Sequence, residues 1–145
     1  MEEPRLSRRI RTDRSTPGAS GGENADAPPA SRIGLLGEEA ARSHLRGKRY
    51  RILAKRLRTR AGEIDLLCRN RRTLVAVEVK TRRSERPEDD LHASQLDRIQ
   101  AALKEVPASL RRRTRDSRID LVAVRLDSRG EVRDLLHIPG IRWFP

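Results

Sequence analysis

Two apolar segments joined by a short basic connection constrain the fold of this chain more than any other feature. Residues 63–68 and 74–80 are rich in aliphatic and β-branched side chains, and mainly Arg lies between them. Two such segments predict an antiparallel β-hairpin. If Arg71-Arg72 form a two-residue turn, Asp65 lies directly opposite Glu78. A shift of one residue in the register would place these two carboxylates on opposite faces of the sheet.

The second segment ends in charged side chains that share a face. Side chains alternate along a strand, so Glu78 and Lys80 point to the same side. Opposed residues have Cβ atoms about 5 Å apart, and two carboxylates at that distance repel unless a divalent cation lies between them. A lysine beside such a cation can orient a water molecule for phosphodiester hydrolysis. The residues therefore predict either a Mg²⁺ or Mn²⁺ site at Asp65 and Glu78, or a structural Glu–Lys ion pair.

The charge of the chain points to a polyanionic partner. The formal net charge is +12, and the first 32 residues, with six Arg and five acidic residues, contribute only +1 of it. The basic surface is therefore expected on the folded part, which favours nucleic acid as the partner. We expect Arg58, Arg60, Arg82 and Arg83 to hold phosphates. The alternative is a solvated basic surface, because 29 of the 33 basic residues are Arg and such a bias also arises from genome composition.

The distribution of apolar residues predicts one domain behind a tail. Residues 1–32 are polar and rich in Pro, Gly, Ser and Ala, so we expect them to be disordered. Residues 33–145 are expected to form one α/β domain, with helices from Ile33 to near Gly47 and from Ala93 towards Leu110. Pro107 is expected to end or kink the second helix. Strands are expected at 49–57, 63–68, 74–80, 119–124 and 131–138. This order predicts a mixed central β-sheet flanked by helices.

Several classes of function are not expected from this composition. Cys68 is the only cysteine, so neither a disulfide framework nor a zinc cluster is expected within one chain, and a core position is predicted for it. The three histidines lack metal-ligand spacing and are expected to be structural or exposed. No apolar run approaches the length of a membrane span or of a signal-peptide core. We therefore expect a cytoplasmic protein without membrane contacts.

Three short motifs carry a resemblance to a known family. Gly37-Glu38-Glu39-Ala40-Ala41, Gly62-Glu63-Ile64-Asp65-Leu66 and Val77-Glu78-Val79-Lys80-Thr81-Arg82 resemble, in order and spacing, the YraN family of uncharacterised bacterial proteins (uncharacterised protein family 0102). Arg118-Ile119-Asp120 is similar to a late strand of that family, so the resemblance extends from about Gly34 to Ile138. The family is similar to the PD-(D/E)XK nucleases, close to archaeal Holliday-junction resolvases. The resemblance implies a restriction-endonuclease-like core.

The resemblance also implies roles for individual residues. Asp65 and Glu78 would be metal ligands, Lys80 the catalytic lysine, and Glu38 a third carboxylate ligand from the first helix. The implied function is that of a Mg²⁺-dependent endonuclease that hydrolyses phosphodiesters of DNA, rather than RNA, or of another structured nucleic acid. Junction-cleaving relatives are dimeric, which implies a homodimer. The alternative is a non-catalytic nucleic-acid-binding protein that retains the nuclease scaffold.

The chain departs from the family at a few positions. Arg56 stands ahead of Arg58 where the family usually has Asn. Gln95 stands where Lys is common early in the second helix, and because related nucleases tolerate Gln there, Gln95 is a candidate nucleic-acid contact. Family aromatics are missing at three positions, which affects packing more than chemistry; these are His44, Ala76 and Ile119.

Overall fold

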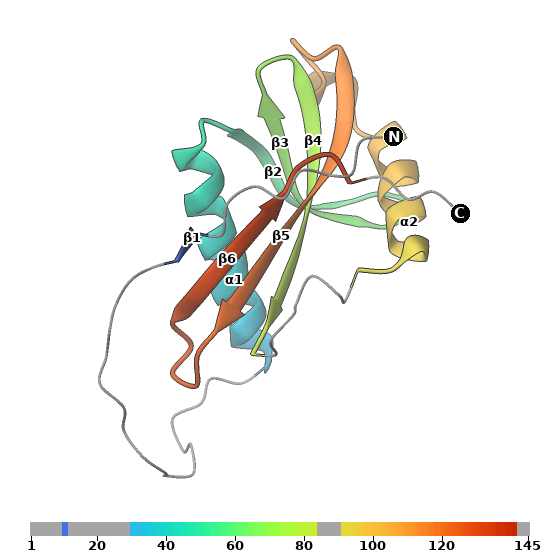
Figure 1. The fold of residues 1–145 in the computed structure, drawn as a ribbon. Coiled ribbons are helices and arrows are strands. Elements are labelled where there is room, and N and C mark those ends of the chain that lie inside the picture. The colour runs from blue at the N-terminus through green and yellow to red at the C-terminus, as the bar shows by residue number, and fades with distance from the viewer. Residues whose placement is uncertain (1–9, 12–29, 84–90, 142–145) are drawn as a thin grey trace, which may run out of the picture.

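The chain folds into a mixed β-sheet with one helix against each face (Figure 1). The computed structural model describes residues 10–11, 30–83 and 91–141. Its elements are β1 (Ile10–Arg11), α1 (Ala30–Gly47), β2 (Arg51–Arg58), β3 (Glu63–Asn70), β4 (Thr73–Arg82), α2 (Ala93–Lys104), the short 3-10 helix η2 (Ala108–Leu110), β5 (Asp116–Leu126) and β6 (Val132–Ile138). The strand order is β1-β6-β5-β4-β3-β2, with β4 and β5 parallel and the other neighbours antiparallel. The predicted α/β class with a mixed, helix-flanked sheet is confirmed.

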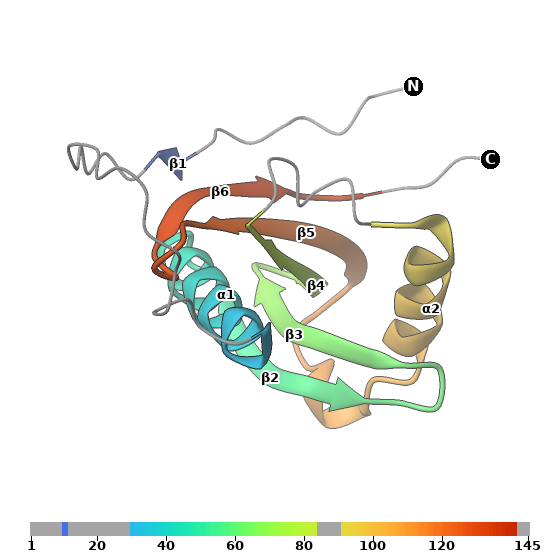
Figure 2. The same cartoon turned by 90° about the horizontal axis from the view of Figure 1, so that it is seen from below.

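The two faces of the sheet bury separate hydrophobic clusters, one under each helix. Seen from below, α1 and α2 lie on opposite sides of the sheet (Figure 2). The central strand β4 serves both clusters by alternation, because Val75 and Val77 pack towards α1 while Leu74 and Ala76 pack towards α2. Cys68 is fully buried in the cluster under α1, as predicted. Of the described helices, none is long and apolar enough to cross a membrane.

The hairpin of β3 and β4 has the predicted turn and register. Asn70 pairs with Thr73, so Arg71-Arg72 form the two-residue turn, and Arg71 adopts a positive φ of 56° that such turns require. The pairing continues to Leu66 opposite Val77. The next position in this register places Asp65 opposite Glu78.

The ends of several elements differ from the sequence-based expectations. The first helix begins at Ala30 rather than Ile33, directly after Pro28-Pro29, whose missing N–H groups disfavour a helix further back. The second helix ends at Lys104, before Pro107 as expected, because the residue before a proline avoids the helical conformation; Ala108–Leu110 form a separate 3-10 helix. Ile10–Arg11, within the predicted tail, pair with β6, and the rest of residues 1–29 lies outside the described residues. Leu35 in this first helix is 53% exposed.

Helix α1 contacts strand β4 most closely at Gly37. A Cβ atom added there would lie 1.7 Å from Thr81 Oγ1 and 2.6 Å from Thr81 Cβ. Only glycine therefore fits at this crossing. The contact determines how closely α1 packs on the sheet. The next residue, Glu38, then lines a pocket together with the last residues of β4.

We expect Gly37→Ala to lower the free energy of unfolding by about 1–3 kcal/mol, because the helix must move away from β4 to admit the methyl group. Urea unfolding followed by circular dichroism measures this loss. Gly34→Ala in the same helix is the matched control, since no atom lies within 4 Å of a Cβ at Gly34. That control should be neutral or stabilising by up to about 1 kcal/mol. Equal effects of the two substitutions would contradict the close contact at Gly37.

Candidate functional site

One pocket brings together the three predicted carboxylates. It has a volume of about 500 Å³ and lies between the N-terminal half of α1 and the ends of β3 and β4. Helix α1 supplies Glu38, β3 supplies Asp65 and β4 supplies Glu78. The complete lining consists of Ile33, Gly34, Glu38, Asp65, Glu78, Val79, Thr81, Arg82 and Arg83. Residues far apart in the chain thus meet where the resemblance implied a site.

The carboxylate of Asp65 is held in place by the backbone of the neighbouring strand. Its Oδ2 accepts a hydrogen bond of 2.9 Å from the N–H of Val79. Burial raises the pKa of Asp65 to about 7, and the negative charge of Glu78, a hydrogen bond with the Glu78 side chain and the charge of Glu38 add to this rise. The Val79 hydrogen bond acts in the opposite direction. Asp65 and Glu78 are therefore neighbours that compete for ionisation.

Lys80 contacts this carboxylate pair directly. Its Nζ lies 3.3 Å from Glu78 Oε1, and the two side chains are only 11% and 14% exposed. The expectation that Glu78 and Lys80 share a face agrees with this contact. The ammonium group therefore stands beside the carboxylates, largely shielded from solvent.

Glu38 is paired with an arginine that the sequence did not assign to the site. Its Oε2 accepts hydrogen bonds from Arg56 Nε at 3.3 Å and Nη2 at 3.2 Å. The register of β2 and β3 places Arg56 opposite Asp65, and Arg56 has a positive φ of 48°. Asn adopts this conformation more readily than most other non-glycine residues. This preference gives a physical reason why the YraN family, which the motifs resemble, usually has Asn at the position of Arg56.

The donor atoms of the pocket fit a hard divalent cation such as Mg²⁺. Within the described residues, no group of three or more His, Cys, Asp or Glu side chains is already arranged around one metal position. Asp65 and Glu78 contact each other, while Glu38 contacts Arg56. Carboxylate oxygens are the ligands that Mg²⁺ takes, and a cation would relieve the repulsion between Asp65 and Glu78. Glu38 would become the third ligand if its carboxylate released its hydrogen bonds with Arg56 and bound the ion instead.

The predicted phosphate-binding residues fall into two places. Arg82 and Arg83 are exposed and line the carboxylate pocket, and Arg82 Nη1 donates to Thr81 O at 2.8 Å. Arg58 and Arg60 line a second pocket instead, between the β2–β3 connection and the C-terminal end of α2. There the carboxylate of Glu105 accepts a hydrogen bond of 2.7 Å from the backbone N–H of Arg60.

Gln95 lies in the first turn of α2 and does not line the carboxylate pocket. Its Oε1 accepts a hydrogen bond of 3.2 Å from the backbone N–H of His92. This is a helix-capping contact. The structure therefore gives Gln95 a structural contact, and its contact with nucleic acid stays a prediction.

A buried polar cluster on β5 is the main feature that sequence reasoning missed. Asp120 is fully buried and accepts hydrogen bonds from Tyr50 Oη at 3.0 Å, Arg118 Nε at 2.9 Å and Gly140 N at 3.0 Å. His137 Nε2 lies 2.8 Å from the same carboxylate. Burial raises the pKa of Asp120, but the hydrogen bonds from His137 and Arg118 outweigh it and hold the pKa below its usual value. The Arg118-Ile119-Asp120 motif was the one signal in the sequence that pointed here.

We expect Mn²⁺ binding to strengthen by up to about tenfold per pH unit as the pH rises towards 7, because Asp65 must lose its proton to coordinate the ion. Calorimetric titration at several pH values measures the affinity.

In the absence of cations, the raised pKa of Asp65 contributes stability that is present below pH 3.8 and is lost as the pH rises through about 7. Asp65→Asn should remove this dependence of stability on pH, and an unaltered profile in the variant would contradict the assignment.

Comparison with known proteins identifies the family. Residues 37–124 match the uncharacterised protein family UPF0102. A UPF0102 protein from Syntrophotalea carbinolica is 35% identical over 111 residues, which cover 74% of this chain and 89% of that protein. One from Symbiobacterium thermophilum is 37% identical over 105 residues, covering 70% of this chain and 89% of that protein. One from Nitrobacter winogradskyi is 53% identical over 55 residues, covering 38% of this chain and 47% of that protein. The chain therefore belongs to the UPF0102 family, the YraN family that its motifs resemble.

Proposed function

We propose that this protein is a metal-dependent nuclease that hydrolyses phosphodiester bonds of DNA in the Glu38, Asp65 and Glu78 pocket. The observation that carries the proposal is the contact between the partly buried Asp65 and Glu78 beside Lys80. A structural ion pair accounts for Glu78 and Lys80, but it does not account for a second carboxylate buried against the first. Such an arrangement costs stability unless a cation offsets it.

Each residue of the pocket has a distinct part in the proposed reaction. Glu38, Asp65 and Glu78 would hold Mg²⁺, which, when bound, supplies a Lewis acid that offsets the charge developing on the phosphate. Lys80, whose Nζ lies beside Glu78, would orient the attacking water molecule. Val79 N–H keeps the Asp65 carboxylate in position.

The substrate side of the pocket is basic. Arg82 is the last residue of β4, the strand that carries Glu78, and Arg83 follows it; both line the same opening. Their guanidinium groups can pair with the phosphates that flank the bond to be cut. The chain has one Trp, one Tyr and one Phe, so base stacking contributes little and recognition rests on the backbone of the nucleic acid.

The fold supports the same proposal. A hairpin that carries both acids, a parallel neighbour for its second strand and a helix that adds a third acid agree with a restriction-endonuclease-like core. This agreement supports our proposal, made by resemblance, that the domain is related to the PD-(D/E)XK nucleases.

Metal dependence tests the proposal. The protein is incubated with linear duplex DNA, a four-way DNA junction and duplex RNA, each in Mg²⁺, in Mn²⁺ and in EDTA. We expect at least one DNA form to be cut in Mg²⁺ or Mn²⁺ and none in EDTA. Cleavage that persists in EDTA contradicts the metal mechanism, and so does the absence of cleavage of every DNA form.

One observation favours a second candidate, a nucleic-acid-binding protein that has lost hydrolysis. The two hydrogen bonds from Arg56 engage the Glu38 carboxylate that the metal would need. Arg56→Asn distinguishes the two candidates, because Asn accepts the positive φ and releases Glu38. Cleavage by this variant and not by the natural protein would assign Arg56 as the group that blocks the site.

A further inference from the structure

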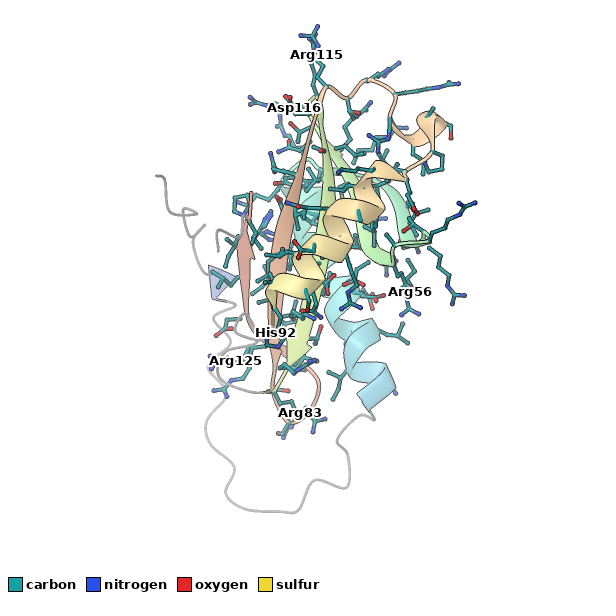
Figure 3. All side chains as sticks on the ribbon, turned by 90° about the vertical axis from the view of Figure 1, so that its right-hand side faces the viewer. Arg56, Arg83, His92, Arg115, Asp116 and Arg125 are labelled. Carbon is teal, nitrogen blue, oxygen red and sulfur yellow. The ribbon has the colours of Figure 1, made fainter. Side chains whose placement is uncertain are left out.

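Three turns with basic side chains meet at the end of the sheet away from the carboxylate pocket. They are the α1–β2 connection at 47–50, the β3–β4 turn at 71–72 and the segment 111–115 before β5. The register brings them together, since Arg51 pairs with Arg69, and Thr73 pairs with both Asn70 and Asp116. The N–H of Arg115 also donates to Arg72 O at 2.7 Å. Figure 3 shows Arg115 and Asp116 at one end of the molecule and Arg83 at the other.

This end of the molecule, which we call the basic end, carries exposed cations and no carboxylate in its three turns. Asp116 is the first acidic residue beyond them. The ion pairs between described residues join none of these cations to an acidic side chain. The exposed cations of the basic end are Lys48, Arg49, Arg71, Arg72, Arg112, Arg113 and Arg115.

The backbone at the basic end is unfavourable for arginine. Arg49 has a φ of 65°, Arg71 of 56° and Arg113 of 65°, one in each turn. Glycine or asparagine adopts this conformation with less strain than arginine does. Strained positions mark places where a side chain is kept in spite of its effect on stability. At the basic end, each of the three turns has a positively charged arginine at such a strained position.

We propose that the basic end binds the phosphate backbone of a duplex arm of the nucleic-acid substrate. Thr73 and Glu78 are five residues apart on β4, so the basic end lies about 17 Å from the carboxylates along the strand. That length corresponds to about five base pairs of B-form DNA. The substrate therefore includes a duplex arm that extends beyond the phosphate at the pocket. The identification of the polyanion as nucleic acid rests on the proposed function.

The triple variant Arg49→Gly, Arg71→Gly, Arg113→Gly tests this surface. Binding is measured in EDTA over a range of salt concentrations, with a hairpin duplex of about 4 base pairs, too short to reach both surfaces, and a duplex of about 20 base pairs that reaches both. The slope of log affinity against log salt should become shallower by about 0.9 for each phosphate that the variant no longer neutralises, up to about 2.7 for three. The loss of affinity should be larger for the longer duplex. The melting temperature should stay equal to that of the natural protein or rise, because the strain is relieved.

Two controls separate charge from backbone effects. Lys at the same three positions keeps the charge and should keep the salt slope. Arg129→Gly removes one charge from the exposed β5–β6 turn at the other end of the sheet and should leave the gain in affinity with duplex length unchanged.

The outcomes also separate this inference from the proposed hydrolysis. An unchanged salt slope and length dependence in the triple glycine variant overturns the inference, as does a natural protein that binds neither duplex. A shallower slope, combined with no cleavage by the natural protein in Mg²⁺, contradicts the proposed hydrolysis and supports the basic end as a binding surface.

Discussion

Replacing Glu78 with Gln is expected to lower the rate of Mg²⁺-dependent cleavage by about 10²- to 10³-fold or more. The amide keeps the shape of the side chain but removes the negative charge that would hold the cation and that pairs with Lys80. The pocket therefore loses metal affinity. The fold stays intact, because the charge of Glu78, which adds to the effect of burial in raising the pKa of Asp65, is removed as well. Binding of duplex DNA in EDTA should persist, because the cations on the substrate side of the pocket are unchanged.

Single-turnover cleavage together with binding in EDTA measures the two effects separately. Glu63→Gln is the matched control, because Glu63 lies on β3, is more exposed than Glu78 and pairs only loosely with Arg58, at 3.7 Å. This control loses the same charge and should cut at the natural rate. Equal rates for the Glu78 variant and the natural protein would contradict the proposed site. A Glu78 variant that neither folds nor binds would instead assign Glu78 to stability.

The part of the fold that follows from local rules was predictable. A two-residue turn and strict alternation together determine a hairpin register, so the sequence alone placed Asp65 opposite Glu78. The parallel pairing of β4 with β5 was not predictable in this way, because the two strands are separated by more than thirty residues that contain α2. No local signal indicates which earlier strand β5 joins. The end of α2 before Pro107 was predictable from the proline alone, whereas the cap that Arg111 places on Leu103 O and Val106 O was not.

In the candidate site, too, some residues follow from local rules and others depend on contacts between distant segments. Lys80 follows from alternation within one strand, whereas Glu38 reaches the pocket only because Gly37 lets α1 approach Thr81, a contact between distant segments. The contact of Arg56 with Glu38 depends on a positive φ in the middle of a strand, which no propensity predicts for arginine. The separation of Arg58 from Arg82 likewise depends on a distant residue, because Glu105 holds the β2–β3 connection towards α2.

Replacing Asp120 with Ala is expected to lower the free energy of unfolding by about 3–5 kcal/mol, the range for a buried ion pair that loses one partner. Arg118 Nε, Tyr50 Oη and His137 Nε2 all contact this carboxylate, and each would be left without its acceptor in a buried setting. Urea unfolding at neutral pH measures the loss of stability. Asp116→Ala, on the same strand but exposed, is the matched control and should change stability by no more than about 0.5 kcal/mol.

Because a loss of this size can unfold a small domain, Asp120→Asn provides a milder variant that keeps one acceptor oxygen. The pH dependence then separates a charge effect from a packing effect. The pKa of Asp120 is held below its usual value of 3.8, so the stability it contributes is present above that pH and is lost as the pH falls through the lowered pKa.

Protonation of His44 at low pH also lowers the stability of the fold, as protonation of Asp120 does. Burial, and then the charge of the neighbouring His137, lower the pKa of His44 from 6.5 to about 4. As the pH falls, His44 therefore binds a proton in the unfolded chain before it does so in the folded protein. This difference destabilises the fold between pH 6.5 and 4. Asp65 acts in the opposite direction, because its raised pKa adds stability as the pH falls from about 7 to 3.8. Below pH 3.8, where the contribution of Asp120 is lost, the natural protein should lose stability and Asp120→Asn should lose less. Equal acid sensitivity of the two proteins would show that the Asp120 cluster stabilises β5 through its shape and hydrogen bonds alone, without a contribution from its charge.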